Sequence, residues 1–595
     1  MRLSKMGSFT AAMRSLLLRV GLLVVLASMA CAQNTDPFNL PRDNPDVLPP
    51  SPGNIRFYDF DVRLVNYTVN CRTKEIITVN GMYPGPIIYA NEGDRVIVNV
   101  TNNSNANMTI HFHGTRQYHS TWMDGVAYIT MCPIQPGDYF THDFMIVQQQ
   151  GTLLWHAHIN WQRATNHGMF ITYPAQPYPF PRPHEEVPIV LAEWWYEDVE
   201  QVEINGLNNG QPFPVSDAMT INGHPGPTYN CSATEGYTTI NAIHGKTYLL
   251  RIINAALNAH LFFSVANHTM TVVEADGAYT YPFETSVVFL SPGQTTNVLI
   301  TASQPGGTYL IQIQGYGRDN IPIVRPAALF KYKDPSPLSP YPFSPVLPAY
   351  NNTGVAYAFD NALRTLYPGR VPLTVNRNLF LTVGLVERVC DNGTLPIANN
   401  CNASFSDGLR YQGAVNNITF RVPDIAILQA SYYNIPGVFT EDFPDNPPHA
   451  YDYTNTTSPP PLLRISNYAT RIIGITFNDT VQVVLQDTMI LGFEDHPFHL
   501  HGQNFYVLGQ GFGNFDPNRD TNGLNLYDPP LRNTVSVPTQ GWAVIRIKMN
   551  NPGVWLFHCH LDKHTSWGME TVFHVHNGIG PNNSYNPPPK RLAAC

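Results

Sequence analysis

The chain is long, apolar and weakly charged. Its 595 residues are too many for one domain, and length alone suggests roughly three or four domains. Hydrophobic residues make up 43% of the sequence and charged residues 13%, a balance that supplies large cores and excludes an intrinsically disordered chain. The net charge of −9 indicates only solubility, and because no basic residues cluster, the composition excludes nucleic acid as a partner.

The N-terminus has the pattern of a secretory signal peptide. Basic residues precede an apolar run at 21–30, and the small residues Ala30 and Ala32 suit cleavage before Gln33. The run, at about ten residues, is short for a membrane-spanning helix, although an N-terminal membrane anchor is the alternative. We therefore predict a signal peptide at residues 1–32 and a secreted, extracellular protein without stable membrane insertion.

Two features of the remaining chain agree with secretion. Roughly a dozen N-x-S/T sequons are present, a density typical of glycosylated extracellular proteins; they include Asn66, Asn99, Asn267, Asn392, Asn417 and Asn478. Apart from Cys31 in the signal peptide and Cys559, the cysteines form an even set that suits disulfides, with many pairings open.

The sequence repeats itself in units of short, β-rich segments. The stretch TVNGMYPGPIIYANEGD at 78–94 is echoed at 220–236, and Pro and Gly separate segments rich in Val, Ile, Thr and Tyr. No long segment has a helical period, and a Pro-rich stretch at 333–348 indicates an extended connection. We predict an all-β protein of three β-sandwich domains at 50–175, 185–335 and 375–577, with a linker at 336–374 and a C-terminal tail at 578–595.

The first and third units each carry two matched His-x-His pairs. On a strand, alternate side chains share a face, so each pair presents two imidazoles to one side. A single pair is usually a surface feature, but four matched pairs supply eight imidazoles, too many for the four ligands of one zinc ion. We therefore expect a multinuclear metal cluster between the two units, held by His111 and His113, His156 and His158, His499 and His501, and His558 and His560.

Cys559 separates the two histidines of the last pair, and strand alternation turns its side chain to the opposite face. His496 and His564 are further candidate ligands, and Met569 follows them. Two histidines, one thiolate and a weak methionine ligand form the donor set of a blue-copper electron-transfer site. The alternatives are a buried free cysteine and a methionine that only fills the core.

These motifs resemble those of the multicopper oxidases. The stretches HFHG, HAH, HPFHLHG and HCHLDKHTSWGM look like the four copper signatures of that family. GFGNFDPNRD, NNPGVWLFHCHLD and WQRATNHG resemble plant-type laccases more closely than ascorbate oxidases. The resemblance implies three cupredoxin-like Greek-key domains and laccase activity, in which phenols lose single electrons while dioxygen is reduced to water.

The resemblance also implies four copper ions, one of type 1, one of type 2 and two of type 3. His496, Cys559 and His564 would hold the type 1 ion, with Met569 as its axial ligand. The paired histidines would hold the other three ions: His111 and His499 the type 2 ion, His113, His156 and His560 one type 3 ion, and His158, His501 and His558 the other.

Three aspartates match acidic residues of the family. Asp124 and Asp562 match acids near the cluster that could supply the protons consumed by oxygen reduction; an alternative, compatible role is to hold ligand imidazoles by hydrogen bonds. Asp217 matches the acid that accepts the phenol proton in related laccases, with a solvated loop aspartate as the alternative.

Met569 departs from the usual laccase pattern, because many laccases have Leu or Phe at the axial position. A coordinating thioether should lower the potential of the type 1 ion, which predicts an enzyme that favours electron-rich phenols. Phe112 is a second departure, since laccases usually have Trp there. The resemblance further pairs the cysteines as Cys71–Cys231, Cys132–Cys595 and Cys390–Cys401.

A secreted laccase is the leading hypothesis: a monomer that acts on phenolic small molecules and dioxygen in the apoplast or cell wall, in lignin or phenolic polymerisation or degradation. Ascorbate oxidase and ferroxidase are alternatives in the same class, since Glu494 and Asp495 beside His496 could bind Fe(II). A non-catalytic cell-wall glycoprotein of the same fold is the alternative from another class. It predicts missing ligands, whereas every ligand position is filled.

Overall fold

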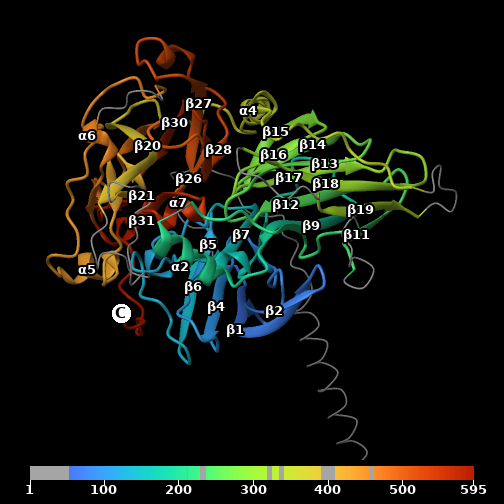
Figure 1. Ribbon diagram of the computed structural model, residues 1–595, viewed down its shortest axis with the longest axis horizontal. Coiled ribbons are helices and arrows are strands. Elements are labelled where there is room, and N and C mark those ends of the chain that lie inside the picture. The colour runs from blue at the N-terminus through green and yellow to red at the C-terminus, as the bar shows by residue number, and fades with distance from the viewer. Residues whose placement is uncertain are drawn as a thin grey trace, which may run out of the picture.

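The computed structural model describes residues 53–210, 212–227, 236–317, 325–333, 341–389, 409–455 and 461–595. Within these ranges the chain forms three two-layered β-sandwiches in sequence order (Figure 1). The predicted signal peptide and the cysteines at 231, 390 and 401 lie outside the described residues. No helix in the described ranges combines the length and apolarity needed to cross a membrane.

The first sandwich, blue in Figure 1, consists of the sheets β2-β1-β4-β6 and β3-β8-β7-β5. Side chains of β4 alternate between core and surface, as the period of a half-buried strand requires. The elements are β1 (Ile55–Val69), β2 (Arg72–Val79), β3 (Ile88–Asn91), β4 (Arg95–Asn102), β5 (Ile110–His113), β6 (Tyr139–Met145), β7 (Gly151–Ala157) and β8 (His167–Tyr173), with the 3-10 turns η1 (Thr121–Met123) and η2 (Gln162–Ala164).

The second sandwich, green in Figure 1, consists of the sheets β10-β9-β12-β17-β14-β15 and β11-β19-β18-β13-β16. Its aromatic and aliphatic residues form a core of their own between the two layers. The strands are β9 (Glu185–Trp194), β10 (Ala218–Ile221), β11 (Thr239–Ala242), β12 (Thr247–Asn254), β13 (His260–Val265), β14 (Met270–Ala275), β15 (Ala278–Thr285), β16 (Val288–Leu290), β17 (Thr295–Thr301), β18 (Thr308–Tyr316) and β19 (Ala327–Tyr332).

The third sandwich, yellow to red, consists of the sheets β23-β22-β21-β20-β25-β30-β27-β28 and β24-β32-β31-β26-β29 (Figure 1). The strands are β20 (Arg377–Val389), β21 (Leu409–Val415), β22 (Ile418–Phe420), β23 (Asn467–Ala469), β24 (Ile473–Ile475), β25 (Thr480–Asp487), β26 (His496–Leu500), β27 (Phe505–Phe512), β28 (Leu531–Arg532), β29 (Thr534–Val537), β30 (Gly541–Lys548), β31 (Gly553–Cys559) and β32 (Glu570–Val575).

Short helices join these layers: α2 (Val199–Asn209), α4 (Thr353–Ala362), α5 (Ile427–Tyr433), α6 (Pro461–Arg464) and α7 (Asp562–Ser566), with η3 (Asp520–Gly523) and η4 (Pro581–Asn583). Helix α4 lies within the segment predicted as an extended linker. Asn352 caps it by accepting a 3.1 Å hydrogen bond from the Val355 amide, and Tyr357 and Phe359 pack on the core of the second sandwich. The connection is therefore packed rather than extended, because its apolar side chains are buried by the neighbouring domain.

The first and third domains share a core. Phe112 and Trp155 of the first domain belong to the same cluster of buried residues as Leu556 of the third. The C-terminus then returns to the first domain, where Cys595 forms the predicted disulfide with Cys132 (Figure 1). The prediction of this bridge is confirmed, and it joins positions separated by 463 residues. Cys71 is also disulfide-bonded, but its predicted partner lies outside the described residues.

Candidate metal centre

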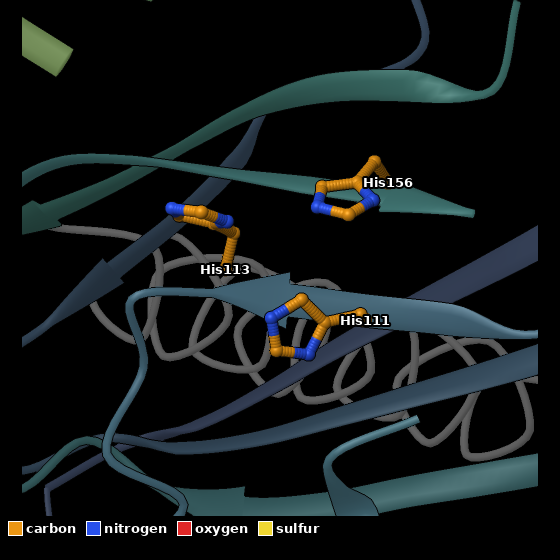
Figure 2. A group of neighbouring side chains, drawn as sticks. All are labelled: His111, His113 and His156. Carbon is orange, nitrogen blue, oxygen red and sulfur yellow. The ribbon is translucent and has the colours of Figure 1, made fainter. Parts of the chain in front are cut away.

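The eight paired histidines lie on four strands or directly after their ends: His158, His501 and His560 follow the last residues of β7, β26 and β31 within one residue. In the first domain β5 pairs with β7 so that His111 lies opposite His156, and in the third domain β26 pairs with β31 so that His499 lies opposite His558. Figure 2 shows His111 and His113 on one strand and His156 on its neighbour, with their rings around a common space. Because each strand alternates its side chains, the second histidine of each pair follows the first to the same face.

The histidines of the two domains meet across the domain boundary. The His113 and His499 rings stack with centroids 3.7 Å apart, the His111 and His501 centroids are 4.0 Å apart, and His113 Nδ1 lies 3.1 Å from His560 Nε2. Three groups have ligand atoms within 4.8 Å of one another: His111, His113 and His156; His111, His499 and His501; and His158, His501 and His558. The structure thus brings all eight imidazoles into one interdomain cluster.

Hydrogen bonds at the backs of the rings determine which nitrogen faces the cluster. His111 Nδ1 donates to the Asp124 carbonyl at 2.7 Å, His156 Nδ1 to the Ala157 carbonyl at 2.8 Å and His499 Nδ1 to the Asn533 carbonyl at 2.8 Å. Because a carbonyl oxygen only accepts, Nδ1 carries the proton and Nε2 keeps its lone pair.

These Nε2 atoms of His111, His156 and His499 are buried and have no hydrogen-bond partner among the described residues. A buried unpaired acceptor costs about 1–3 kcal/mol unless something binds it. A metal ion is the partner that neutral imidazoles oriented in this way accept best. The residues present therefore fit a metal cluster, by the chemistry of their donor atoms as well as by their spacing.

Burial keeps the ligand imidazoles neutral. Seven of the eight paired histidines have a pKa well below the ordinary value, because burial disfavours the charged ring and neighbouring histidines or Arg163 repel a second positive charge; they are His113, His156, His158, His499, His501, His558 and His560. Neutral imidazole is the form that binds a metal ion, so the site has no proton to displace near neutral pH.

Two of the predicted acids lie beside the cluster. Asp124 is fully buried, and its Oδ2 accepts a 2.9 Å hydrogen bond from His501 Nδ1. Asp562 Oδ2 lies 3.1 Å from Arg163, whose guanidinium in turn contacts His560 Nδ1 at 2.5 Å. Burial raises the pKa of Asp562 to about 6, against the opposing effect of Arg163. Asp124 thus contacts a cluster histidine directly, and Asp562 reaches one through Arg163.

Arg163 was not singled out by the sequence analysis, although it stands in the laccase-like stretch WQRATNHG. It is buried and also donates to the His560 carbonyl at 3.0 Å. An arginine within the apolar, laccase-like stretch was the signal available in the sequence. Its contact with His560 could not be predicted, because His560 belongs to another domain.

A second group gathers on the opposite face of β31. Cys559 Sγ lies 3.3 Å from His564 Nδ1 and 3.7 Å from His496 Nδ1, and the two Nδ1 atoms are 3.2 Å apart. Burial raises the pKa of the Cys559 thiol and lowers the pKa of both imidazoles to about 4. A thiol this hard to ionise becomes a thiolate only beside a strong cation, so the donor set fits a soft metal ion.

Carboxylates hold the outer nitrogens of these two rings. His564 Nε2 lies 3.0 Å from Glu494 Oε2, and His496 Nε2 lies 3.3 Å from Asp487 Oδ1. Such partners fix the orientation of ligand imidazoles and direct Nδ1 toward the metal position. Glu494 and Asp487 are supporting residues that the sequence pattern did not identify in this role.

Met569 is attached to this site through the backbone. Its carbonyl accepts from the Cys559 amide at 3.1 Å, its amide donates to the His564 carbonyl at 2.9 Å, and its buried side chain belongs to the same core cluster as Cys559. Gly413 on β21 leaves room for it, because a Cβ there would lie 2.7 Å from Met569 Cβ.

A cavity of about 550 Å³ opens beside the second group. It is lined by the aromatic side chains of Trp195, Phe213 and Trp567, and by residues adjacent in sequence to the ligands. Asp217 is not among the lining residues: it is exposed, and its Oδ2 accepts from the Tyr196 amide at 2.7 Å. The acids that line the cavity are Glu193, Glu494 and Asp495.

A separate cavity of about 390 Å³ reaches the interdomain cluster at His156 and His158. Four carboxylic acids line it, namely Glu200, Glu203, Asp562 and Glu570. Burial raises the pKa of Glu203 and of Glu570 to about 8. Both acids therefore hold a proton at neutral pH. Neither was predicted: Glu203 lies on α2, far from the histidine motifs in sequence, and Glu570 directly follows Met569 but is not part of the ligand pattern.

Comparison with known proteins agrees with this geometry. Models of the multicopper oxidases match residues 61–177, 185–335 and 442–578. Laccase-11 of Arabidopsis thaliana is 48% identical over 552 residues, which cover 91% of this chain and 96% of the relative. Laccase-2 of Oryza sativa subsp. japonica is 49% identical over 551 residues, covering 91% and 95%. The chain therefore belongs to the multicopper oxidase family.

Solved structures confirm the predicted all-β fold of three cupredoxin-like domains. The laccase from Botrytis aclada matches with a TM-score of 0.69 and 24% identity over 91% of this chain and 90% of that one. Fet3p, a multicopper oxidase that functions in iron import, matches with a TM-score of 0.68 and 23% identity over 89% and 94%. At these identities the likeness concerns the fold alone. The plant relatives define the activity: this protein is an oxidoreductase of the plant laccase type, which binds copper and oxidises its substrates with dioxygen.

Proposed function

We propose that the protein is a secreted laccase that holds four copper ions and oxidises phenols, acting as a monomer in the apoplast or cell wall. The observation that carries the proposal is the set of eight converging imidazoles on one face of β5, β7, β26 and β31, with Cys559 between two of them and facing the other way. A laccase needs one site that accepts single electrons and a second that reduces dioxygen, and this arrangement provides donors for both.

The proposed ligands are those that the resemblance to the multicopper oxidases implies. His496, Cys559 and His564 would hold a type 1 ion, with Met569 axial; His111 and His499 a type 2 ion; His113, His156 and His560 one type 3 ion; and His158, His501 and His558 the other. Three of these sets, at the Cys559 site, at His158 and at His111 with His499, have ligand atoms within 4.8 Å of one another. Bound copper would take electrons one at a time from a phenol and transfer four to dioxygen, which becomes two waters.

The chain itself links the two sites. Cys559 is covalently bonded to His558 and His560, so its thiolate and two cluster ligands share one short stretch of backbone. Its amide and the Met569 carbonyl form a hydrogen bond at the same point. This stretch would give electrons a short covalent path between the sites.

Protons for the reduction of oxygen would come from the buried acids. Asp124 touches the cluster through His501, and the acids of the 390 Å³ cavity extend from His158 toward α2. Glu203 is part of this row, where it accepts a 2.7 Å hydrogen bond from Ser566 Oγ. Because Glu203 and Glu570 are protonated at neutral pH, they can donate as the reaction consumes protons.

The 550 Å³ cavity would bind the phenol. Trp195, Phe213 and Trp567 offer aromatic faces, and the buried His260 Nε2 has no hydrogen-bond partner among the described residues. Three acids line this cavity, and Glu494 and Asp495 among them are paired with Lys563, Thr539 and Tyr357. Glu193 could accept the phenol proton, the role that the sequence pattern suggested for Asp217. An aromatic ring with one hydroxyl matches this combination of stacking surface and polar groups.

The carboxylates beside the type 1 site argue against a ferroxidase. Asp495 Oδ1 accepts from the Thr539 amide at 2.9 Å and Oδ2 accepts from Tyr357 at 3.0 Å, while Glu494 pairs with Lys563 at 2.9 Å. These acids are committed to protein partners. Fe(II) would compete with these partners for the carboxylate oxygens.

Secretion is supported by the N-terminal pattern, by the density of sequons and by the disulfides. Asn267 of one sequon is exposed at a turn, where a glycan can be attached. The Cys132–Cys595 disulfide agrees with an oxidising compartment, in which such bonds persist.

One experiment tests the proposed function. The copper-loaded mature protein is compared in an oxygen electrode with a methoxyphenol, ascorbate and Fe(II), and its copper content is measured. We expect four copper ions per chain and oxygen uptake that is fastest with the phenol. Faster uptake with ascorbate or Fe(II) would indicate one of the other oxidases, and full copper content without oxygen uptake would indicate a non-catalytic protein.

A further inference from the structure

A fifth His-x-His pair lies outside the copper centres. His574 is on β32, and His576 follows it and remains paired to the neighbouring strand, because its amide donates to the Ile475 carbonyl at 2.9 Å. Strand alternation puts both imidazoles on one face. The two rings lie with their centroids 4.4 Å apart.

Glu441 completes a group of three possible ligands. One of its carboxylate oxygens contacts His574 Nδ1, and the other lies 3.2 Å from His576 Nε2. One donor atom from each of the three residues lies within 4.8 Å of the others. The backbone beside this glutamate is held in place, because Thr440 is paired with Arg471 next to β24.

Gly474 keeps the space between these donors open. It lies opposite His574 in the parallel pair of β24 and β32. A Cβ at Gly474 would lie 2.8 Å from Glu441 Oε2 and 3.2 Å from His576 Nε2, within the group itself. Gly474 does not have a positive φ, so its backbone conformation does not require glycine. The missing side chain instead leaves room between the three donors.

The back of His574 is arranged as in metal-ligating histidines. Its Nε2 lies 3.2 Å from Ser431 Oγ on α5, and the His574 side chain is only 8% exposed. A ligand imidazole commonly donates its second N–H to such an oxygen, which orients the ring and leaves the other nitrogen free for the ion. His576, by contrast, is 47% exposed, so an ion can enter from solvent.

We propose that Glu441, His574 and His576 form a further metal site on the surface of the third domain, which takes a divalent transition-metal ion such as zinc or copper. Two imidazoles and one carboxylate are ligands suited to these ions, and solvent water would fill the remaining positions. Because copper binds such donors more tightly than zinc, the copper-loaded protein is first desalted against a weak chelator, which leaves the four buried copper ions in place and empties this exposed site. The site is distinct from the copper centres. His574 pairs with Val554, five residues before Cys559 along β31 and so roughly 17 Å from it.

Zinc binding to the full, copper-loaded protein tests this proposal. The protein is equilibrated with a small excess of Zn²⁺, desalted, and analysed for zinc and copper by mass spectrometry. We expect the wild-type chain to retain one more zinc ion than His576→Ala, with the same copper content in both. His244→Ala, which removes another exposed histidine, should retain as much zinc as the wild type.

Gly474→Ala provides a second test that leaves every ligand in place. Its methyl group enters the space between Glu441 and His576, so zinc retention should fall as it does in His576→Ala. Co²⁺ added in place of zinc should give a visible absorption band in the wild type that both variants lose. Equal zinc retention in the wild type and His576→Ala, or an equal loss in the His244→Ala control, would show that the triad is only a hydrogen-bonded ion pair.

Discussion

His113 and His499 stack across the boundary between the first and third domains, with ring centroids 3.7 Å apart and planes inclined by 16°. The two residues are distant in sequence and neither domain contains the whole cluster. Any ion bound there is therefore held by both domains at once. Without the ion, the two domains lose a group that binds both of these neutral imidazoles.

Copper removal should therefore lower the thermal stability of the protein. A ligand that binds only the folded state stabilises it by about 4 kcal/mol when its free concentration is about a thousand times Kd. Scanning calorimetry before and after chelation should show a lower Tm for the stripped protein, with recovery on adding copper back. Equal Tm values in the two states would contradict an interdomain cluster that binds metal.

Met569→Leu should raise the potential of the type 1 site, because it removes the thioether donor and leaves an apolar side chain of similar volume. Such swaps usually cost less than about 1.5 kcal/mol of stability, so the variant should fold. A redox titration of the blue absorption measures the change. Met169→Leu, at a buried methionine of β8, is the matched control and should leave the potential unchanged. If Met569→Leu has the wild-type potential, Met569 only fills the core.

Asp124→Asn should slow the reduction of oxygen without slowing the uptake of electrons from the phenol. Asp124 contacts His501 but does not line the cavity proposed to bind the phenol. Loss of a group that transfers protons costs roughly 10²-fold or more in rate. Stopped-flow bleaching of the blue site without oxygen should be unchanged, while steady-state kcat falls. Asp59→Asn, at an exposed position, serves as the control, and slower bleaching in Asp124→Asn would point to damage elsewhere.

Glu203→Gln should change how stability depends on pH. Burial raises the pKa of Glu203 from 4.5 to about 8, so the folded chain keeps a proton that the unfolded chain releases. The contribution of this acid is fully favourable below about pH 4.5 and is lost as pH rises toward 8. The variant should therefore gain on the wild type by up to about 1.4 kcal/mol per pH unit across that window.

Denaturant unfolding at several pH values between 5 and 8 measures this gain. Glu75→Gln, at an exposed glutamate, should follow the wild-type curve throughout. A constant difference between Glu203→Gln and the wild type would show that Glu203 is ionised in the folded protein, and it could then not act as a proton donor.

Glu193→Gln and Asp217→Asn separate two candidate acceptors of the phenol proton. Glu193 lines the cavity, whereas Asp217 is exposed and bonded to the Tyr196 amide. A hydrogen bond to a charged group contributes about 1.5–3 kcal/mol, so Glu193→Gln should lower kcat/KM for a methoxyphenol about tenfold or more. Asp217→Asn should keep kcat/KM within about twofold. A larger loss of kcat/KM in Asp217→Asn than in Glu193→Gln would show that Asp217 accepts the phenol proton.

The candidate ligands could be predicted from sequence because their signals are local. The strand period shows that the neighbours of Cys559 face away from it, and this alone separates two metal sites within HCH. The same motifs identified the family, and with it the all-β fold. Asp562 was accessible in the same way, since it lies two residues after His560, and Asp124 was identified because TWMDG matches the family.

Only the packing of domains decides which of these groups meet. Three contacts join segments that are separated by long stretches of chain. They are the stacking of His113 on His499, the contact of Arg163 with His560 and the position of Glu203 in the 390 Å³ cavity. Helix α4 was missed for a related reason, since the face it buries is covered by another domain. Hydrophobic period describes one element at a time, whereas burial, and with it the raised pKa of Glu203, arises when separate domains close around the same space.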